Sequence, residues 1–570
     1  MRVQHKLLVM AIGLSWLSFS PLLWAQTPNS PNTLDPTERS RPKLPALPSD
    51  LPTPQPQPLT PNPQPPIPNP QSPTPTTRIL VKQVRVLGST VFDVAELDKI
   101  VEPFIGKEST FEDLLAIRTA ITQLYINRGY ATSGAFLPPQ DVSDGVVTVQ
   151  VIEGELERLD LKGLARLKPE YVRDRIGIAT QAPISILRLE AALQLLQSDP
   201  LFASVQAELK AGTAPGRSVL EVTLKEAPTV KGDLIVENRD SPSVGAIRYS
   251  ASLNHINLLG FGDRLNAEVG FTSGISSYRI GYDFPINAYD GSLSINYSRD
   301  NSRIIEQPFS ALDINGISHT LSLGWRQPLI RTPDREFALG LSLDLRESQT
   351  YLLGNMPFSF SPGPEDGKSR VTAIRFSQDW VNRSPTQVLA ARSQFSLGIG
   401  AFNATINDSG TDGRFLSWLG QFQYVQSLGQ DAILIGRIAA QLSNGSLLPI
   451  EQFSIGGLDT VRGYRQNRIV GDNGIVGSIE ARLPIVREPE GIGLIQIAPF
   501  FDIGTIWNHA GVASNPSTLA SIGVGLRWQI GSVATIRLDY GLPLNRNNQP
   551  GNSIEDNGFT FSVRIQAMSY

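Results

Sequence analysis

The sequence predicts two small α+β modules in tandem, followed by a membrane β-barrel of about sixteen antiparallel strands. Three observations predict this architecture. The order strand–helix–helix–strand–strand (βααββ) occurs twice between residues 78 and 227. Helical periodicity then ends, and from about residue 230 onwards apolar and polar residues alternate. The alternating segments are about 9–12 residues long, the length that a tilted strand needs to cross a bilayer.

The composition excludes several classes of function. The 570 residues include no cysteine, which excludes disulfides and thiolate metal sites. The four histidines are far apart, which argues against a site built on several of them. The net charge of −4 provides no basic surface for nucleic acid. Nucleotide loops, zinc-protease helices and nucleophile elbows are missing. We therefore expect a protein that is not an enzyme, with no catalytic residue, no metal and no cofactor.

Residues 1–25 have the layout of a secretory signal peptide. Arg2 and Lys6 precede an apolar run from Leu7, and cleavage is expected after Ala25. The alternative is an uncleaved anchor helix, for which the run is short. No later run is long and apolar enough for a transmembrane helix, so an exported chain would enter a membrane as a closed barrel.

Residues 26–77 are expected to form a Pro-rich linker. Proline fixes φ and has no N–H to donate, so this stretch favours extended polyproline II over packed structure. The linker is either a tether or disordered filler, and the sequence does not decide between them.

The first module is expected at residues 78–153. Its second helix follows Thr110, a candidate N-cap with Asp113 in the capping-box position, and ends at Gly129. The full order is a strand at 79–87, helices at 94–104 and 110–129, and strands at 130–137 and 146–152.

The second module is expected at residues 154–227. Its order repeats that of the first, which suggests a repeated binding unit. The elements are a strand at 156–161, helices at 171–176 and 186–196, and strands at 202–209 and 218–225.

The barrel is expected at residues 228–570. In its last three segments every second residue is apolar, and Trp528, Tyr540 and Phe559 lie where interfacial aromatic girdles occur. Apolar and polar residues also alternate along the strands of a soluble β-sandwich, which is the alternative interpretation of this region. The opposite face carries charges that suit a water-filled lumen: Arg346, Arg437, Arg527, Arg537 and Arg564.

Two stretches within the barrel stand out. Residues 456–464 combine two adjacent glycines with one arginine and one tyrosine, a pattern of neither strand nor helix. This stretch is interpreted as a loop of fixed shape that carries a cation to one place. About forty residues later, Asp502 lies on the polar side of a strand that runs from Phe500 to Gly504.

This order of parts resembles the transporters of two-partner secretion, the haemolysin-activator family within the superfamily of outer-membrane assembly barrels. The resemblance covers nearly all of the chain after residue 78. In the first module, the motifs match the family's polypeptide-transport-associated (POTRA) domain: Gly88-Ser89-Thr90, the run from Tyr125 to Tyr130, Leu137-Pro138-Pro139-Gln140, Asp144-Gly145 and Glu153-Gly154. In the barrel, the matching motifs are Asn257–Asp263, Val461-Arg462-Gly463-Tyr464 and Phe500-x-Asp502-x-Gly504.

The resemblance implies a sixth extracellular loop that folds into the lumen and puts Arg462 on Asp502, as a latch. The alternative is two independent, hydrated lumen charges. Some family members carry an N-terminal plug helix, but residues 26–77 are too rich in proline to supply a long one. The expected latch residues are Gly456, Gly457, Val461, Arg462, Gly463, Tyr464, Phe500, Asp502 and Gly504.

The resemblance further implies that the modules capture an unfolded exported partner in the periplasm, of the adhesin or haemolysin type. The barrel would lie in outer-membrane lipid as a monomer and pass the partner outward. Strand edges can add an extended peptide, so candidate contacts are Tyr130 and Phe136 on one strand and Phe202 and Val205 on another. An insertase for other barrels, a passive porin and a surface enzyme are the alternatives; the two modules favour secretion.

Overall fold

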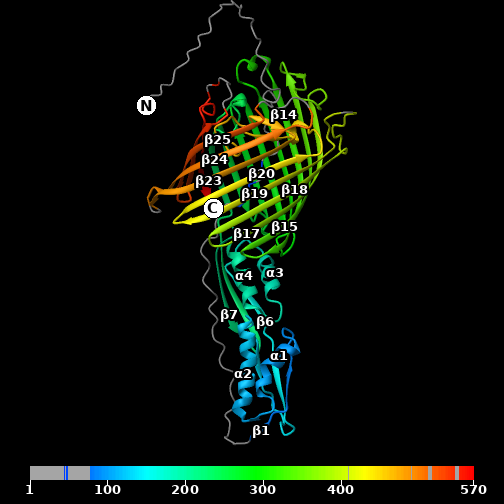
Figure 1. The fold of residues 1–570 in the computed structure, drawn as a ribbon, viewed down its shortest axis with the longest axis vertical. Helices are drawn as coiled ribbons and strands as arrows, with labels where there is room; N and C mark the ends of the chain where they lie inside the picture. Colours follow the sequence, from blue (N-terminus) through cyan, green and yellow to red (C-terminus); the bar gives the residue numbers. More distant parts are fainter. Residues whose placement is uncertain are drawn as a thin grey trace, which may run out of the picture.

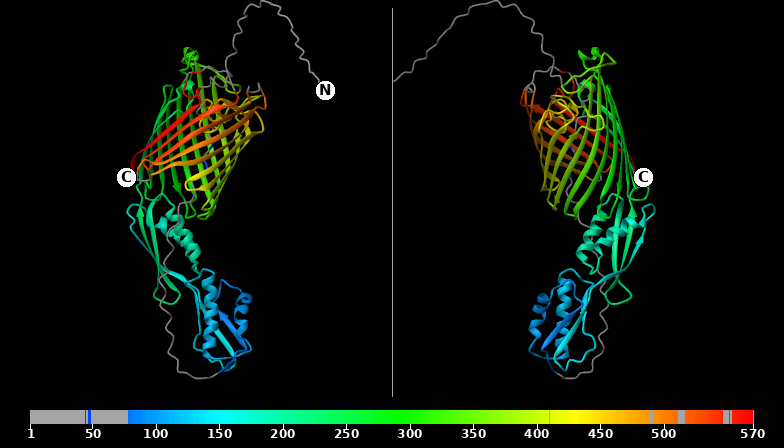
Figure 2. Two further views of the ribbon diagram at one scale, coloured as in Figure 1. Left: turned by 60° about the vertical axis from the view of Figure 1, so that its left-hand side comes forward. Right: turned by 90° about the vertical axis from the view of Figure 1, so that its right-hand side faces the viewer.

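The structure, a computed structural model, describes residues 44, 46–48, 78–408, 410–488, 491–510, 516–545, 551 and 553–569. The expected signal peptide and nearly all of the expected linker lie outside the described residues. Two small modules follow one another beneath a barrel, and together they form an elongated molecule (Figures 1 and 2). Within the described ranges, no helix has the length and hydropathy required to span a membrane.

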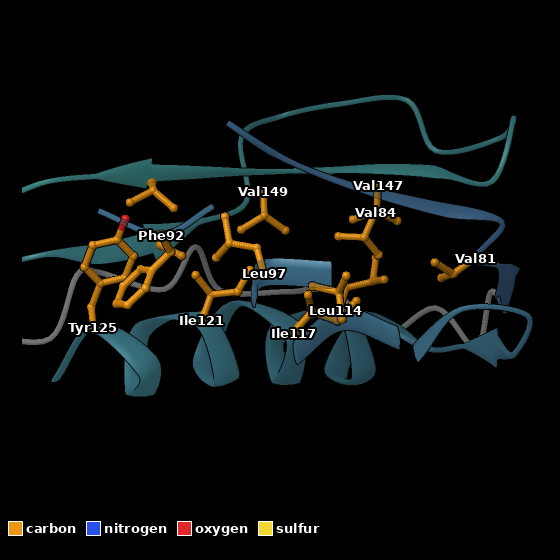
Figure 3. Packing of buried hydrophobic residues seen from close by; sticks show 13 residues of the cluster. Val81, Val84, Phe92, Leu97, Leu114, Ile117, Ile121, Tyr125, Val147 and Val149 are labelled. Carbon is orange, nitrogen blue, oxygen red and sulfur yellow. The ribbon is translucent and has the colours of Figure 1, made fainter. Parts of the chain in front are cut away.

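The first module packs helices against a three-stranded sheet of order β2-β5-β4. Ile117, Ile121 and Tyr125 of the long helix α2 face Val147 and Val149 of the central strand β5 (Figure 3). The elements are β1 (Ile79–Leu80), β2 (Gln83–Leu87), α1 (Val94–Val101), η3 (Glu102–Phe104), β3 (Glu108–Ser109), α2 (Phe111–Asn127), β4 (Gly134–Phe136) and β5 (Val146–Ile152).

Helix α2 begins at the predicted capping box. The Thr110 hydroxyl oxygen accepts a hydrogen bond from the Asp113 N–H, and the Asp113 carboxylate accepts one from the Thr110 N–H. Two strands are shorter than predicted. The chain changes pairing partner around Val81, because that side chain is fully buried in the core. Residues 130–133 turn instead of pairing, because the Tyr130 ring packs against Phe92 and Tyr125.

Apart from the additional β1–β3 pair of the first module, the second module repeats the order of the main elements and the topology of the three-stranded sheet. Its sheet order is β6-β8-β7, and β6 runs parallel to the central strand β8 as β2 does to β5. Both helices are longer than predicted from their apolar positions. The elements are β6 (Glu155–Lys162), α3 (Pro169–Ala179), α4 (Ile186–Gln197), β7 (Phe202–Ala211) and β8 (Arg217–Glu226).

A glutamate closes each module in the same way. Glu153 accepts a hydrogen bond from the Thr90 N–H (2.7 Å), in the loop that follows β2. It accepts another from the hydroxyl of Tyr125 (2.9 Å) on α2. Glu226 accepts three from backbone N–H groups of residues 165–167 in the matching loop. Burial alone would raise the pKa of Glu153, but these hydrogen bonds hold the pKa below its ordinary value.

Sixteen long strands form a closed antiparallel barrel, as predicted, because β27 pairs with β9. The two-residue β16 (Met356–Pro357) only extends the end of β15. The long strands are β9 (Val230–Glu237), β10 (Arg248–Ile256), β11 (Arg264–Phe271), β12 (Ile275–Pro285), β13 (Ser292–Arg303), β14 (Asn315–Arg331), β15 (Arg335–Leu352), β17 (Lys368–Arg383), β18 (Gln387–Ile399), β19 (Phe415–Gly429), β20 (Ala432–Ser443), β23 (Asn473–Glu488), β24 (Gly493–Trp507), β25 (Thr518–Ile530), β26 (Ala534–Pro543) and β27 (Phe559–Ser569).

The strands alternate between a lipid-facing and a lumen-facing side. On β24, Phe501 and Ile503 are exposed on the outer surface, whereas Asp502 between them is fully buried inside. On β25, Ile522 and Val524 are likewise exposed. A closed barrel with an apolar outer face and an ionic interior is a membrane structure and rules out the β-sandwich alternative.

The second module docks on the barrel through the turn at residues 257–263. The Lys168 N–H donates to the Gly260 carbonyl (2.8 Å), and the Lys168 ammonium lies 3.3 Å from the centre of the Phe261 ring. Arg175 of α3 also donates to Asp290, in the next turn on the same end of the barrel. The modules are therefore attached to the end of the barrel at which β9 begins.

Candidate lumen latch

The β20–β23 loop, residues 444–472, is the sixth loop at the end of the barrel away from the modules, and it folds into the lumen. It forms its own hairpin, in which β21 (Phe453–Ile455) pairs with β22 (Ile469–Gly471). This two-stranded sheet is separate from the barrel ladder. Side chains, and not shared strands, therefore hold the loop to the barrel wall.

Arg462 lies at the tip of this loop and contacts Asp502 on β24 through three hydrogen bonds. Its Nε and Nη2 donate to the two carboxylate oxygens (2.7 and 2.9 Å), and its backbone N–H donates to Oδ2 (3.1 Å). The Arg462 side chain is 3% exposed and that of Asp502 is 0% exposed. The structure thus brings together the two charges that the sequence singled out, as a desolvated bidentate pair.

Other groups complete the arginine site. The Arg462 guanidinium also donates to Glu480 on β23 and to Asp539 on β26. Its central carbon lies 3.5 Å from the centre of the Phe500 ring, a cation–π contact between two buried side chains. Removing one partner of a buried pair costs about 3–5 kcal/mol, so this contact can hold the loop firmly.

The remaining motif residues shape the loop around the arginine. Gly456 and Gly457 both have positive φ (111° and 95°), which glycine tolerates. Val461 is fully buried in the hydrophobic cluster beneath the loop. The Tyr464 hydroxyl donates to the Ala520 carbonyl on β25 (2.9 Å).

Two glycines permit close approach to the wall and the stem. A Cβ on Gly463 would lie 2.7 Å from the Gly541 carbonyl oxygen of β26. A Cβ on Gly504 would lie 3.0 Å from Cδ1 of Ile455 in the loop stem.

Sequence reasoning missed a second buried ionic contact of the same loop. Glu451, in the short helix η6 (Pro449–Glu451), accepts hydrogen bonds from Arg346 on β15 (2.6 Å) and Arg375 on β17 (2.9 and 3.0 Å). Its side chain is 2% exposed. The inward charge of Arg346 was expected, but a lone glutamate in a loop gave no signal for its partner.

Part of the expected linker lies inside the barrel. Leu44 packs against the cluster beneath the sixth loop, and Leu47 against the apolar side chains of β17–β20. The Gln423 amide donates to the carbonyls of Leu47 (3.3 Å) and Pro48 (2.6 Å). Leu44, Ala46 and Leu47 therefore line a lumen cavity of about 280 Å³ beside the loop, and these residues are not a free tether.

The four candidate contact residues of the modules lie on or beside edge strands. Phe136 is on β4 and Val205 on β7, and each strand is at the edge of its sheet. Phe202, however, is buried in the core of its module, and Tyr130 and Val205 pack against the module cores. Substituting any of these three would disturb the fold of its module before any contact with a partner.

Comparisons with known proteins place the chain in a family. A family model described as haemolysin secretion/activation protein ShlB/FhaC/HecB matches residues 216–528, more than half of the chain, and one for a ShlB-type POTRA domain matches residues 79–154.

The chain is also similar to two proteins named outer membrane transporter CdiB, and to one solved structure. The protein from Escherichia coli is 26% identical over 81% of this chain and 79% of its own length; that from Dickeya dadantii (strain 3937) is 23% identical over 79% and 80%. The structure of CdiB from Escherichia coli shares the fold with a TM-score of 0.69 and 24% identity, covering 88% of this chain and 92% of that one. The chain belongs to the haemolysin secretion/activation family ShlB/FhaC/HecB.

Proposed function

We propose that this chain is the outer-membrane pore that carries one exported partner protein from the periplasm to the cell surface. Transport by two-partner secretion, location in the outer membrane and periplasmic POTRA domains are properties of the family to which the chain belongs. The observation that carries the proposal is the separate hairpin of the sixth loop. Because it shares no strand pairing with the wall, it can leave the lumen while the barrel stays closed.

We further propose that the partner is an adhesin or haemolysin and that it is captured on a strand edge of the modules. Among the described residues, β7 has ten residues and pairs with β8 alone, whereas β4 has three residues. Main-chain hydrogen bonds to such an edge need little sequence specificity, which suits an unfolded chain. A closed barrel has no edge of its own to satisfy, which supports a monomer.

The mechanism follows from this arrangement. The captured chain reaches the periplasmic mouth of the barrel. The contact between Arg462 and Asp502 then breaks, and the tip of the sixth loop moves to open a path through the lumen. The wall stays intact because its backbone bonds run between neighbouring strands. Folding of the partner outside the cell would then drive export, since the sequence has no nucleotide site.

The test is export of the partner in cells that carry the wild-type chain, no chain, or Arg462→Ala. We expect the partner to remain in the periplasm without the chain. With Arg462→Ala we expect export to fall at least about tenfold while the barrel still folds, because the loop loses its resting position. Normal export without the chain, together with failed assembly of other outer-membrane proteins, would establish the insertase alternative instead.

A further inference from the structure

The lipid-facing side of four neighbouring strands, β13, β14, β15 and β17, carries a row of charges. Residues that are paired directly across antiparallel strands point to the same side of the sheet. One such row, from β13 to β17, consists of Tyr297, Leu321, Leu345 and Thr372. The next row on the same side is two residues farther from the modules on every strand, and it consists of Arg299, His319, Glu347 and Arg370.

This charged row lies at the outer edge of the membrane. On the lipid-facing side of β15, every second residue from Phe337 to Leu345 is apolar, over a stretch of nine residues. This is the length that a tilted strand needs to cross a bilayer. Glu347 follows at the end of the barrel away from the modules, which are periplasmic in this family. The row is therefore at the level of the lipid headgroups in the outer leaflet.

The cations of the row exceed its single carboxylate. Arg370 Nε lies 2.6 Å from Glu347, and Nε2 of His319 lies 4.0 Å from the same carboxylate. Arg299 donates to the side-chain oxygen of Asn301 at 3.4 Å and forms no ion pair within the described ranges of the chain. Two arginines and one glutamate give the row a net charge of +1 when His319 is neutral.

Other charges at this end of the four strands lie farther from the membrane than the row. They carry both signs, and two of the cations have carboxylates close by, at 2.8 Å and 3.1 Å. These charged residues are Arg303, Asp313, Glu365, Asp366 and Lys368. An anion at the membrane edge therefore meets Arg299 before it meets any of them.

The surroundings of Arg299 are those of a headgroup site. Tyr278 on β12 is the second cross-strand partner of Arg299, and Tyr297 lies next to it in the row below. The two tyrosines are 44% and 41% exposed, and such amphipathic rings are typical of the membrane interface. The lipid-facing side of β18, β19 and β20 is different at this end, since it exposes Leu397, Leu416 and Leu442. The charge is thus concentrated over β13–β17.

We propose that Arg299, together with His319 and Arg370, binds a phosphate group of a lipid in the outer leaflet. The planar guanidinium of Arg299 donates to two phosphate oxygens at once, and the acyl chains of the lipid lie on the apolar rows below. A phosphorylated glycolipid provides both parts. Glu347 limits the affinity, because it already neutralises Arg370. The site does not depend on the transport function proposed above.

Native mass spectrometry of the full-length protein in detergent, titrated with diphosphoryl lipid A, measures this binding. We expect Arg299→Gln to weaken it about tenfold, because a charge-assisted bidentate contact is lost. We expect Glu347→Gln to tighten it about threefold, because Arg370 is then free for the phosphate. The matched control is Arg335→Gln, which removes an exposed arginine from the lipid-facing side of the other end of β15. Arg335 lies 3.3 Å from Asp334, so this variant should bind like wild type.

Dephosphorylated lipid A and inorganic phosphate identify the ligand. We expect the dephosphorylated lipid to bind wild type and Arg299→Gln equally weakly. A large excess of inorganic phosphate should leave lipid A bound, because free phosphate makes no apolar contact with the rows below. Displacement by inorganic phosphate would contradict a lipid site.

Three further results would overturn the proposal: unchanged binding of lipid A by Arg299→Gln, equal weakening by Arg335→Gln, or no gain with Glu347→Gln. Arg299 is exposed, so its variants should fold, and heat-modified mobility of the barrel on gels checks this. Arg299→Lys keeps the charge without the planar fork and should weaken binding less than Arg299→Gln. Equal binding by these two variants would contradict recognition by charge.

Discussion

At the scale of single residues, the contact that we propose as a latch depends on geometry that only arginine provides. Its planar guanidinium donates to both oxygens of Asp502 while one face covers the Phe500 ring. Lysine would keep the charge but not the bidentate contact. The site could be predicted because both charges lie in short, unusual motifs. Glu451 could not, because its partners are more than seventy residues away in sequence and no local pattern joins them.

The glycine contact behind the latch gives a prediction that leaves every charge in place. A Cβ on Gly541 would lie 2.7 Å from the backbone nitrogen of Gly463, which is too close for van der Waals contact, so the backbone of one of the two segments would have to move. We expect Gly541→Ala to push the tip of the loop away from β26 and to raise the open fraction of single channels in planar bilayers. Gly436→Ala on β20 is the matched control, because a Cβ there meets nothing within 4 Å. Equal behaviour of the two variants would show that close approach at Gly541 is not needed.

At the scale of elements, local sequence signals predicted most of the helices and strands of the two modules. The capping box placed the start of α2 because its hydrogen bonds are made within four residues. Strand ends were less predictable, since the burial of Val81 and Tyr130 depends on the assembled core. The matching roles of Glu153 and Glu226 could not be read from the sequence either, because each carboxylate meets a loop about sixty residues away.

The glutamate of the first module makes its stability depend on pH. Because hydrogen bonds lower the folded-state pKa of Glu153 below its ordinary 4.5, its stabilising effect is complete well above pH 4.5 and is lost as the pH falls through the folded-state value. We expect Glu153→Gln to weaken the module at neutral pH and to flatten its acid dependence. Cleavage within residues 78–153 of the full-length protein, by pepsin at acidic pH and by trypsin at neutral pH, measures this. The exposed Glu112→Gln is the control and should cleave like wild type at every pH; an unchanged profile for Glu153→Gln would refute the role.

At the scale of the whole molecule, one turn couples the modules to the barrel. Asp263 is fully buried and accepts hydrogen bonds from the Leu259 N–H (2.9 Å) and the Tyr282 hydroxyl (3.0 Å), which fixes the turn that contacts Lys168. We expect Asp263→Ala to loosen the turn and widen the distribution of distances between spin labels on α3 and on the barrel. Since the chain has no cysteine, such labels are free of background. A distribution as narrow as that of the wild type would mean that other contacts hold the junction.

Alternation along the strands predicted the barrel and its strand number, because a side chain that faces lipid must be apolar whatever its neighbours. The position of residues 44 and 46–48 inside the lumen was not predictable. Proline-rich sequence specifies an extended backbone, but not the surface against which it lies. Only the assembled wall, with Gln423 and the apolar side chains of β17–β20, provides that surface.

The central claim is that the stem of the sixth loop must leave the wall during export. The most direct measurement is export by a double-cysteine variant, Ile455→Cys with Gly504→Cys, whose side chains meet between the loop stem and β24. We predict that export stops when the two thiols are joined and resumes when they are reduced, whereas export by each single variant is the same under oxidising and reducing conditions. Undiminished export with the two thiols fully joined would contradict the account.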